Sequence, residues 1–173
     1  MKRVDSKPVY EGRIINVRID TFRYADGAEA EREIAEHPGA VAIIPVDDEV
    51  VWLVRQPREA VGEPDLLELP AGKLDVEGES RLECAQRELV EEIGRTASEW
   101  TELKRFYTSP GFAEEEVTVF LATGLAEVAD HEPDPEERIE LVPWPLAKLD
   151  AAIEECIDAK SLIGLLLLRD RLR

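Results

Sequence analysis

The sequence predicts a mixed α/β or α+β sandwich, in which strands are interleaved with helices and the last element is a helix. Two features carry this prediction. Residues 40–44 and 50–54 are short apolar runs typical of strands buried on both faces, and residues 80–93 repeat apolar side chains at helical spacing. With 173 residues, 44% of them hydrophobic, the chain is long enough to bury one core.

The first residues of the chain predict a separate β unit at 1–38, ahead of a main domain at 39–173. Ile15, Val17 and Ile19 alternate with polar residues, as in a strand with one exposed face. The Ala-Asp-Gly sequence at 25–27 is a turn signal that would fold this strand back as a hairpin.

The segment 80–93 carries the clearest helix signals. Ser80 and Glu83 have the spacing of a capping box, and Gly94 suits the end of the helix. A stretch punctuated by proline and glycine, 57–78, leads into it. Further strands are predicted at 101–107, 117–122 and 139–144, and further helices at 146–158 and 162–172.

The charge excludes several classes of partner. The chain has 39 acidic and 21 basic side chains, which gives a formal net charge of -18. Because such a chain repels phosphate backbones and anionic lipids, we expect neither a nucleic acid nor a membrane surface as partner. An anionic substrate would need a cation between itself and the protein.

The cysteines and histidines narrow the chemistry further. Cys84 and Cys156 lie in apolar helical patterns without a CxxC motif, which indicates buried, reduced thiols. The apolar runs are too short to span a bilayer, and we expect a cytoplasmic protein. His37 and His131 lie far apart in polar settings, which argues against a histidine zinc site or a Ser-His-Asp triad.

Three carboxylates lie close together on the predicted helix. On a helical wheel Glu88, Glu91 and Glu92 share an arc of about 100° that borders the apolar stripe. Arg87 can reach Glu91 four residues on, but one guanidinium does not neutralise three acids. Carboxylate oxygens are ligands that Mg²⁺ prefers. The spacing alone leaves two interpretations open, a solvated acidic face and a cation site.

The flanking residues resemble the Nudix box, a loop-helix-loop with the pattern G-x5-E-x7-R-E-U-x-E-E-x-G-U, where U is aliphatic. The sequence matches this pattern in register from Glu79 to Gly94. It departs from it twice: six residues instead of five separate Gly72 from Glu79, and Arg95 stands where an aliphatic residue is usual. We expect a longer loop before the helix and altered packing at its end.

The resemblance implies an α/β/α sandwich around a mixed sheet, and hydrolysis of a nucleoside diphosphate linked to another moiety. It implies Mg²⁺, or Mn²⁺ in its place, as the cofactor. The family pattern assigns the following roles: Glu88 and Glu92 as principal metal ligands, Glu91 as a further ligand or supporting acid, the Ala71 carbonyl as another ligand, Glu79 as support for the helix start, and Arg87 as the residue that orients the glutamates.

Residues outside the box are similar to the ADP-ribose pyrophosphatase group. The segments concerned are 55–58 (Arg-Gln-Pro-Arg), 69–72 (Leu-Pro-Ala-Gly) and 109–112 (Ser-Pro-Gly-Phe). This likeness implies that Arg58 binds the substrate phosphates and that Glu68 contacts the substrate. Their alternatives are a surface salt bridge and a polar strand residue. It also implies a homodimer whose subunits exchange the N-terminal β unit.

The catalytic base of this group comes from a late loop, for which the acidic segment 132–138 is the counterpart. Glu137 is the first candidate for a metal ligand or the base, because it matches an acid that the group uses near the metals, and Glu136 is the second. Pro135 stands where the group can place its base, so the choice between them stays open. A solvated acidic loop is the alternative. Glu115, after the Ser-Pro-Gly turn, is a further residue expected to face the pocket.

The leading functional hypothesis is Mg²⁺-dependent hydrolysis of ADP-ribose to AMP and ribose 5-phosphate. One alternative is a Nudix hydrolase of another small nucleoside diphosphate derivative, such as a nucleotide sugar or an oxidised nucleotide. Another is a domain that senses ADP-ribose without cleaving it, against which the intact set of three glutamates argues. A calcium-binding module would need a loop of alternating acids with a glycine, which the sequence lacks.

Overall fold

The computed structural model describes residues 1–129 and 138–173. These residues form two compact units. Unit 1 comprises residues 1–39 and 106–116, and unit 2 comprises residues 40–105 and 117–173. The sequence indicated an N-terminal β unit, but nothing in it indicated that residues 106–116 belong with that unit.

Unit 1 contains a three-stranded antiparallel sheet in the described residues, with the order β1-β2-β3. The strands are β1 (Lys2–Glu11), β2 (Asn16–Arg23) and β3 (Glu29–Glu36). The turn signal at 25–27 lies between β2 and β3 as predicted, with Gly27 at a φ of 86° that favours glycine. Strand β1 was not predicted, because every one of its residues is exposed and it has no apolar alternation.

Residues 106–116 join this sheet through main-chain and side-chain contacts. The Ala35 N–H donates to the Phe112 carbonyl at 2.7 Å, and the Glu114 N–H donates to the Ala35 carbonyl at 3.1 Å. The Arg18 guanidinium on β2 bonds both Glu36 and Glu114. Because the contacts made by Phe112 and Glu114 span about 80 to 100 positions of sequence, no local pattern could predict them.

Unit 2 is built on a mixed sheet of seven strands within the described residues. Its main order is β10-β5-β4-β9-β8, with β6 paired to β5 and β7 paired to β4. Strands β4 and β9 run parallel, whereas β10, β6 and β4 each pair antiparallel with β5. The strand bounds are β4 (Ala40–Asp47), β5 (Val50–Arg58), β6 (Glu63–Glu68), β7 (Ala71–Lys73), β8 (Arg95–Tyr107), β9 (Glu116–Glu127) and β10 (Glu140–Pro145).

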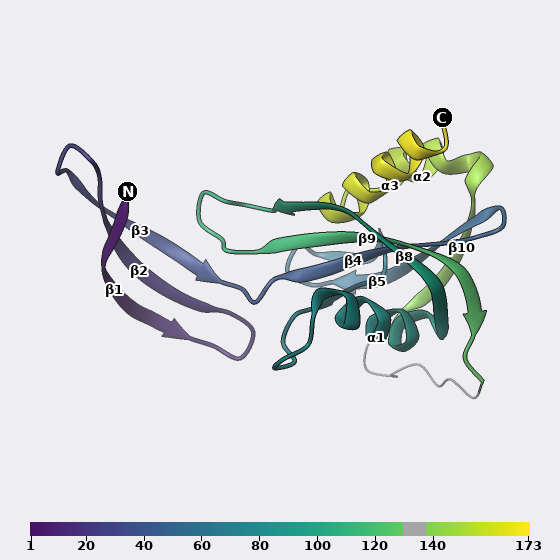
Figure 1. The fold of residues 1–173 in the computed structure, drawn as a ribbon, viewed down its shortest axis with the longest axis horizontal. Coiled ribbons are helices and arrows are strands. Elements are labelled where there is room, and N and C mark those ends of the chain that lie inside the picture. Colours follow the sequence, from purple (N-terminus) through teal and green to yellow (C-terminus); the bar gives the residue numbers. More distant parts are fainter. Residues whose placement is uncertain (130–137) are drawn as a thin grey trace. The chain divides into compact units, whose positions relative to one another are not determined.

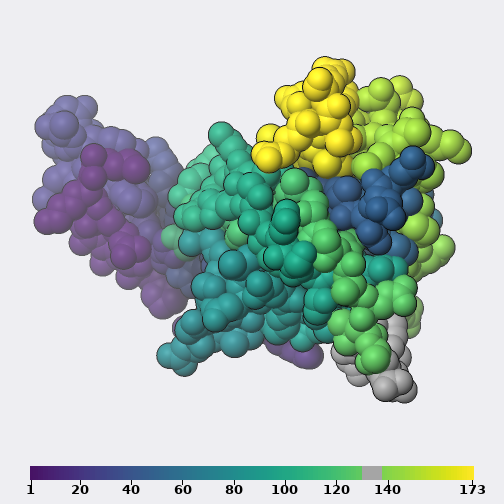
Figure 2. Space-filling view, turned by 45° about the vertical axis from the view of Figure 1, so that its right-hand side comes forward, coloured from purple at the N-terminus to yellow at the C-terminus, as the bar shows by residue number. Residues whose placement is uncertain are grey.

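Helices cover both faces of this sheet (Figure 1). Helix α1 (Arg81–Ile93) lies on one face, and the short η1 (Leu146–Lys148), α2 (Leu149–Glu155) and α3 (Ala159–Arg171) lie on the other. In Figure 2 the C-terminal helix α3, in yellow, forms an outer layer of unit 2. The α/β/α sandwich around a mixed sheet is therefore confirmed.

The strands and helices follow the predicted order, with longer or shorter bounds. The capping box of α1 is formed in both directions, and Gly94 ends the helix in the left-handed conformation. Strands β6 and β7 were not predicted, because they lie in the proline- and glycine-punctuated stretch and have few apolar residues. The helix predicted at 146–158 ends earlier, since the backbone at Cys156 is extended.

One part of the core of unit 2 lies between α1 and the sheet, and another includes buried residues of α2 and α3 such as Ala152, Leu165 and Leu168. Val41, Ile43, Leu89 and Phe120 are among the buried members of the first part. Cys84 belongs to the same cluster, and both cysteines are free and buried, as predicted. Burial, with a smaller effect from the charge of Glu88, raises the pKa of the Cys84 thiol to about 12. Among the described helices none is long and apolar enough to cross a membrane.

Candidate active site

Two glutamates of α1 face inward, toward the segment that contains β7. Glu88 is 9% exposed and Glu92 is 7% exposed. Gly72 on β7 makes room for Glu88: a Cβ atom at this position would lie 1.9 Å from Cδ of the glutamate. The Ala71 N–H donates to Oε2 of Glu92 at 3.1 Å. The structure thus brings together Ala71, Glu88 and Glu92, three of the residues assigned by the family pattern.

Arg87 holds three carboxylates at once, in what we call the Arg87 cluster (Arg87, Glu79, Glu88 and Glu91). Its Nε and Nη2 donate to the two oxygens of Glu79 at 2.9 and 3.0 Å. Its Nη1 donates to Glu88 at 2.8 Å and to Glu91 at 2.7 Å, which confirms the contact predicted four residues along the helix.

The Arg87 cluster carries more negative than positive charge. Hydrogen bonds from Arg87 lower the pKa of Glu79 below its usual value, so this acid is ionised at neutral pH. One guanidinium therefore faces several carboxylates in a partly buried setting, where the effective dielectric constant is lower than in water. A cation added beside the Arg87 cluster would relieve the repulsion among its acids.

The donor set suits a hard divalent cation, because it consists of carboxylate and carbonyl oxygens. In residues 1–129 and 138–173, however, no three His, Cys, Asp or Glu side chains converge in the way that metal ligands do. Mg²⁺ commonly uses one or two carboxylates and takes the rest of its ligands from water and substrate phosphates. The buried glutamates and the Ala71 backbone fit that mode of binding.

A second group of charges, the Glu68 cluster, consists of Glu68, Arg58 and Lys160. Glu68 at the end of β6 is 1% exposed. Arg58, the last residue of β5, donates to its two oxygens from Nε at 2.6 Å and from Nη2 at 2.8 Å. Lys160, in the first turn of α3, also donates to Glu68. The bonds to Glu68 raise the pKa of Arg58, against the lowering effect of burial.

Sequence reasoning named Arg58 and Glu68 but missed Lys160. The one local signal was Asp158 followed three residues later by Ser161, which marks a helix start and says nothing about what that helix contacts. The contact joins residues 92 positions apart, so it depends on how α3 packs on the sheet.

Other residues named from the sequence belong to unit 1, to the segment outside the described residues, or to the start of β8. Glu115 belongs to unit 1, where Thr108 Oγ1 donates to it at 2.6 Å and His37 Nε2 lies 3.7 Å away. Glu136 and Glu137 lie outside the described residues. Arg95, the departure from the box, places its guanidinium 4.1 Å from the centre of the Trp52 ring, where the long side chain packs in place of an aliphatic one.

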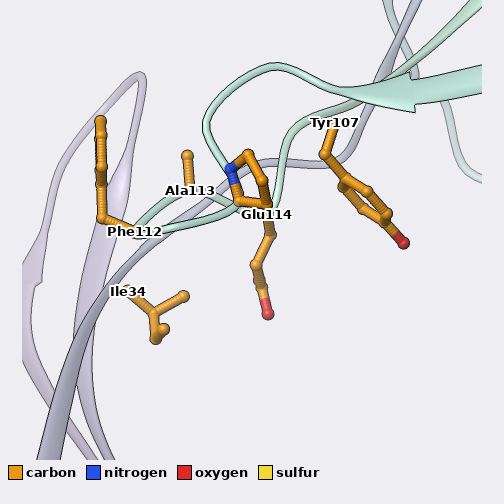
Figure 3. A pocket seen from close by; sticks show the side chains of 6 residues that line it. Ile34, Tyr107, Phe112, Ala113 and Glu114 are labelled. Atoms are coloured by element: carbon orange, nitrogen blue, oxygen red, sulfur yellow. The ribbon is translucent and has the colours of Figure 1, made fainter.

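Unit 1 also contains a cavity of its own, with a volume of about 430 Å³. Figure 3 shows Phe112 and Tyr107 toward its two ends, with Glu114 between them. The lining residues are Ile34, Tyr107, Pro110, Phe112, Ala113 and Glu114. Glu114 therefore lines this cavity, whereas Glu115 is not among its lining residues.

Comparisons with known proteins identify the family. Residues 36–162 match the model of the NUDIX domain. The ADP-ribose pyrophosphatase of Bacillus subtilis (strain 168) is 38% identical over 164 residues, which cover 92% of this chain and 88% of the relative. The ADP-ribose pyrophosphatase of Mycobacterium tuberculosis (strain ATCC 25618 / H37Rv) is 40% identical over 167 residues, covering 94% and 80%.

A solved structure shows the same fold. The structure titled "Crystal structure of ADP compounds hydrolase" superposes with a TM-score of 0.84 at 27% identity, and covers 99% of this chain and 93% of its own. Together with the buried glutamates of α1 and the family match over most of the sequence, this likeness shows that the chain belongs to the Nudix family.

Proposed function

We propose that this protein hydrolyses ADP-ribose to AMP and ribose 5-phosphate with Mg²⁺, or Mn²⁺, as cofactor. The observation that carries the proposal is the placement of Glu88 and Glu92, both buried, against the backbone of Ala71 and Gly72. In the reaction one phosphorus–oxygen bond of the pyrophosphate is broken. The oxygen of water forms the new bond to phosphorus, and the bridging oxygen leaves with the other phosphate.

The metal would be held by Glu88, Glu92 and the carbonyl of Ala71, with Glu91 as a further ligand or supporting acid. When bound, such a cation neutralises phosphate charge and makes a water molecule more acidic. Arg87 fixes the orientation of the glutamates through its bonds to Glu88 and Glu91. These acids are therefore held close to their working positions before a substrate arrives.

The substrate would be bound mainly through its diphosphate. Arg58 is the proposed phosphate ligand, and its two bonds to Glu68 hold the guanidinium in a fixed plane. Glu68 acts on the substrate through Arg58, since both of its oxygens are occupied. Glu137, or Glu136 in its place, is proposed to take the proton from the attacking water, and Glu115 remains a proposed contact.

ADP-ribose is the preferred substrate because two relatives that align over most of this chain bear the name ADP-ribose pyrophosphatase. The structural relative is named for ADP compounds as a class. Hydrolysis of another nucleoside diphosphate derivative is therefore the second candidate. Retention of Glu88, Glu91 and Glu92 argues against a sensor that binds without cleaving, since binding alone does not require all three acids.

We also propose that the protein is a homodimer in the reducing cytoplasm. Large apolar side chains are exposed on unit 1 at Val9, Tyr10, Ile14 and Ile15, an arrangement that a partner subunit would cover. The two buried free thiols suit a reducing compartment. Light scattering of the purified protein tests the dimer, and a monomeric mass at micromolar concentration would contradict it.

A substrate panel with and without Mg²⁺ tests the function. We expect AMP to be released fastest from ADP-ribose, and chelation with EDTA to abolish the release. Glu92→Gln should lower kcat by at least about a hundredfold, because it removes a ligand charge at the metal. Glu154→Gln is the matched control, since Glu154 is exposed on α2, across the sheet from α1. Undiminished turnover by Glu92→Gln would refute the metal assignment.

A further inference from the structure

Glu68 is a buried acid with two cationic partners from different layers of unit 2. Arg58 approaches it from the neighbouring strand of the sheet, and Lys160 approaches it from helix α3. A single cation would be enough to balance one carboxylate. The second cation, Lys160, is also paired with Asp158, and burying this further ion pair has a desolvation cost that needs a physical reason.

The two cations differ in their access to solvent. The Arg58 side chain is 41% exposed, whereas that of Lys160 is 15% exposed. Nε and Nη2 of Arg58 bond Glu68, while Nη1 makes none of the hydrogen bonds recorded among the described residues. Arg58 is therefore the outer cation, able to contact a ligand, and Lys160 is the inner one.

Lys160 is held firmly in place by the start of α3. Asp158, the N-cap residue, accepts from Lys160 Nζ at 2.9 Å and from the Ser161 N–H at 3.0 Å. Ser161 Oγ in turn accepts from the Leu69 N–H at 2.7 Å, which fixes the helix start to the residue after Glu68. Gly164 deepens this contact, because a Cβ there would lie 2.4 Å from Cδ1 of Leu69.

We propose that Lys160 is a positioning residue that keeps Glu68 paired while Arg58 engages the diphosphate of the substrate. An unpaired buried carboxylate is strongly unfavourable, so without Lys160 Arg58, its remaining partner in residues 1–129 and 138–173, would be confined to Glu68. With Lys160 present, Arg58 can share its donors with an anion at little cost. This inference rests on the proposed function, because it assumes that Arg58 binds the phosphates.

The test measures binding and turnover separately. ADP is the probe for binding, titrated by calorimetry with Mg²⁺ present, because a cation between the acids and the diphosphate is part of the proposed binding. The AMP content is measured after the titration to exclude hydrolysis. Lys160→Met should weaken ADP binding and raise KM for ADP-ribose by about tenfold or more, the scale expected for a charged hydrogen bond. The value of kcat should stay within about twofold, since the lost interaction acts on ground state and transition state alike. Lys160→Arg should restore most of the affinity.

The matched control is Lys104→Met, which removes the same charge from an exposed site on β8. A general effect of net charge would lower the ADP affinity of Lys160→Met and Lys104→Met equally.

A double-mutant cycle distinguishes a positioning role of Lys160 from an effect on stability alone. In an Arg58→Ala or a Glu68→Gln background, Lys160→Met should have little further effect on ADP affinity, because the partner through which it acts is gone.

The outcomes separate the two proposals. If the wild-type protein binds ADP but does not cleave ADP-ribose, the proposed function fails, and the role of Lys160 is still decided by ADP affinity. If ADP-ribose is cleaved and Lys160→Met binds ADP as tightly as the wild type with unchanged KM, the Lys160 proposal is overturned. A lowered melting temperature with unchanged affinity would also overturn it. Absence of ADP binding and of turnover in the wild type would overturn both.

Discussion

The Arg87 cluster and the Glu68 cluster of unit 2 have opposite compositions. In the first, one guanidinium is shared by three carboxylates. In the second, one buried carboxylate is shared by two cations. The first arrangement would be stabilised by an added cation, whereas the second offers the partly exposed guanidinium of Arg58 to an anion. A metal–diphosphate pair supplies both, so the two clusters are suited to opposite charges of the same bound complex.

This difference shows what a net charge can and cannot exclude. The value of -18 correctly describes the chain as a whole and argues against extended polyanionic partners. It does not describe the local surroundings of Glu68, where an acidic protein places two cations against one buried acid. The functional electrostatics therefore depend on which side chains are buried together, and only a small part of the acidic excess belongs to the Arg87 cluster.

Among changes that keep every charge, the largest effect is expected from Gly72→Ala, which tests whether the Arg87 cluster needs its geometry or only its charges. The added methyl group would collide with Cδ and Oε1 of Glu88, so the carboxylate must move while every charge is retained. We expect kcat to fall about a hundredfold, as for a displacement of roughly 1 Å at a reacting site. Steady-state kinetics on ADP-ribose at saturating Mg²⁺ measure this.

Gly164→Ala is the matched control, because its methyl group would instead meet Leu69 and Ile44 in the α3 layer. It should act on thermal stability and leave kcat unchanged. If Gly72→Ala retained a normal kcat, the position of Glu88 would not matter, and the comparison of the two clusters would reduce to a comparison of net charges.

The Arg87 cluster could be predicted from sequence almost completely, whereas the Glu68 cluster could not. Glu88, Glu91 and Arg87 are fixed relative to one another by the period of a single helix, whose ends were marked by Ser80 and Gly94. Lys160 meets Glu68 only because α3 packs across the sheet. A local pattern shows which residues lie on one face of a helix, but not which distant residues that face contacts.

The lack of a local signal also explains the other differences between the predicted and the observed structure. Residues 106–116 join unit 1 through long-range hydrogen bonds, and β1 is ordered by its pairing with β2 although its own residues are all exposed. Neither feature has a local signal, because the stabilising partner lies elsewhere in the chain. The motif also could not show that the Arg95 guanidinium would pack on the Trp52 ring.

The second prediction concerns Asp158, the acid that orients Lys160 in the Glu68 cluster. Burial disfavours its charged form, but the charge of Lys160 and the hydrogen bonds from Ser161 outweigh this effect and lower the pKa of Asp158 below its usual value. A lowered pKa in the folded state stabilises the fold above the unfolded-state pKa. This contribution is lost as the pH falls through the folded-state value.

Asp158→Asn should therefore lower the free energy of unfolding by about 1–2 kcal/mol at pH 7, with the N-cap itself preserved because asparagine is also a good cap. The difference from the wild type should shrink below about pH 4, near the pKa of an unfolded aspartate. Urea unfolding from pH 7 down to pH 3 measures it. Asp150→Asn, at an exposed ion pair with Arg169, should show almost no difference. A deficit independent of pH would contradict the assigned charge role.

The smallest effect is expected outside both clusters, from Arg95→Leu, which restores the aliphatic residue usual at this position of the Nudix box. The change removes a cation–π contact with Trp52 and an ion pair with the exposed Glu127. Such a contact contributes about 0.5–1 kcal/mol, and the buried leucine offsets part of it, so the free energy of unfolding should change by less than about 1 kcal/mol. Because Arg95 touches neither the Arg87 cluster nor the Glu68 cluster, kcat and KM should stay within about twofold, the range in which a remote packing change leaves both steps intact. Urea unfolding and steady-state kinetics on the same preparation check both statements. A large fall in kcat with normal stability would mean that the end of α1 transmits strain to Glu92, and that the Arg87 cluster extends to the end of the helix.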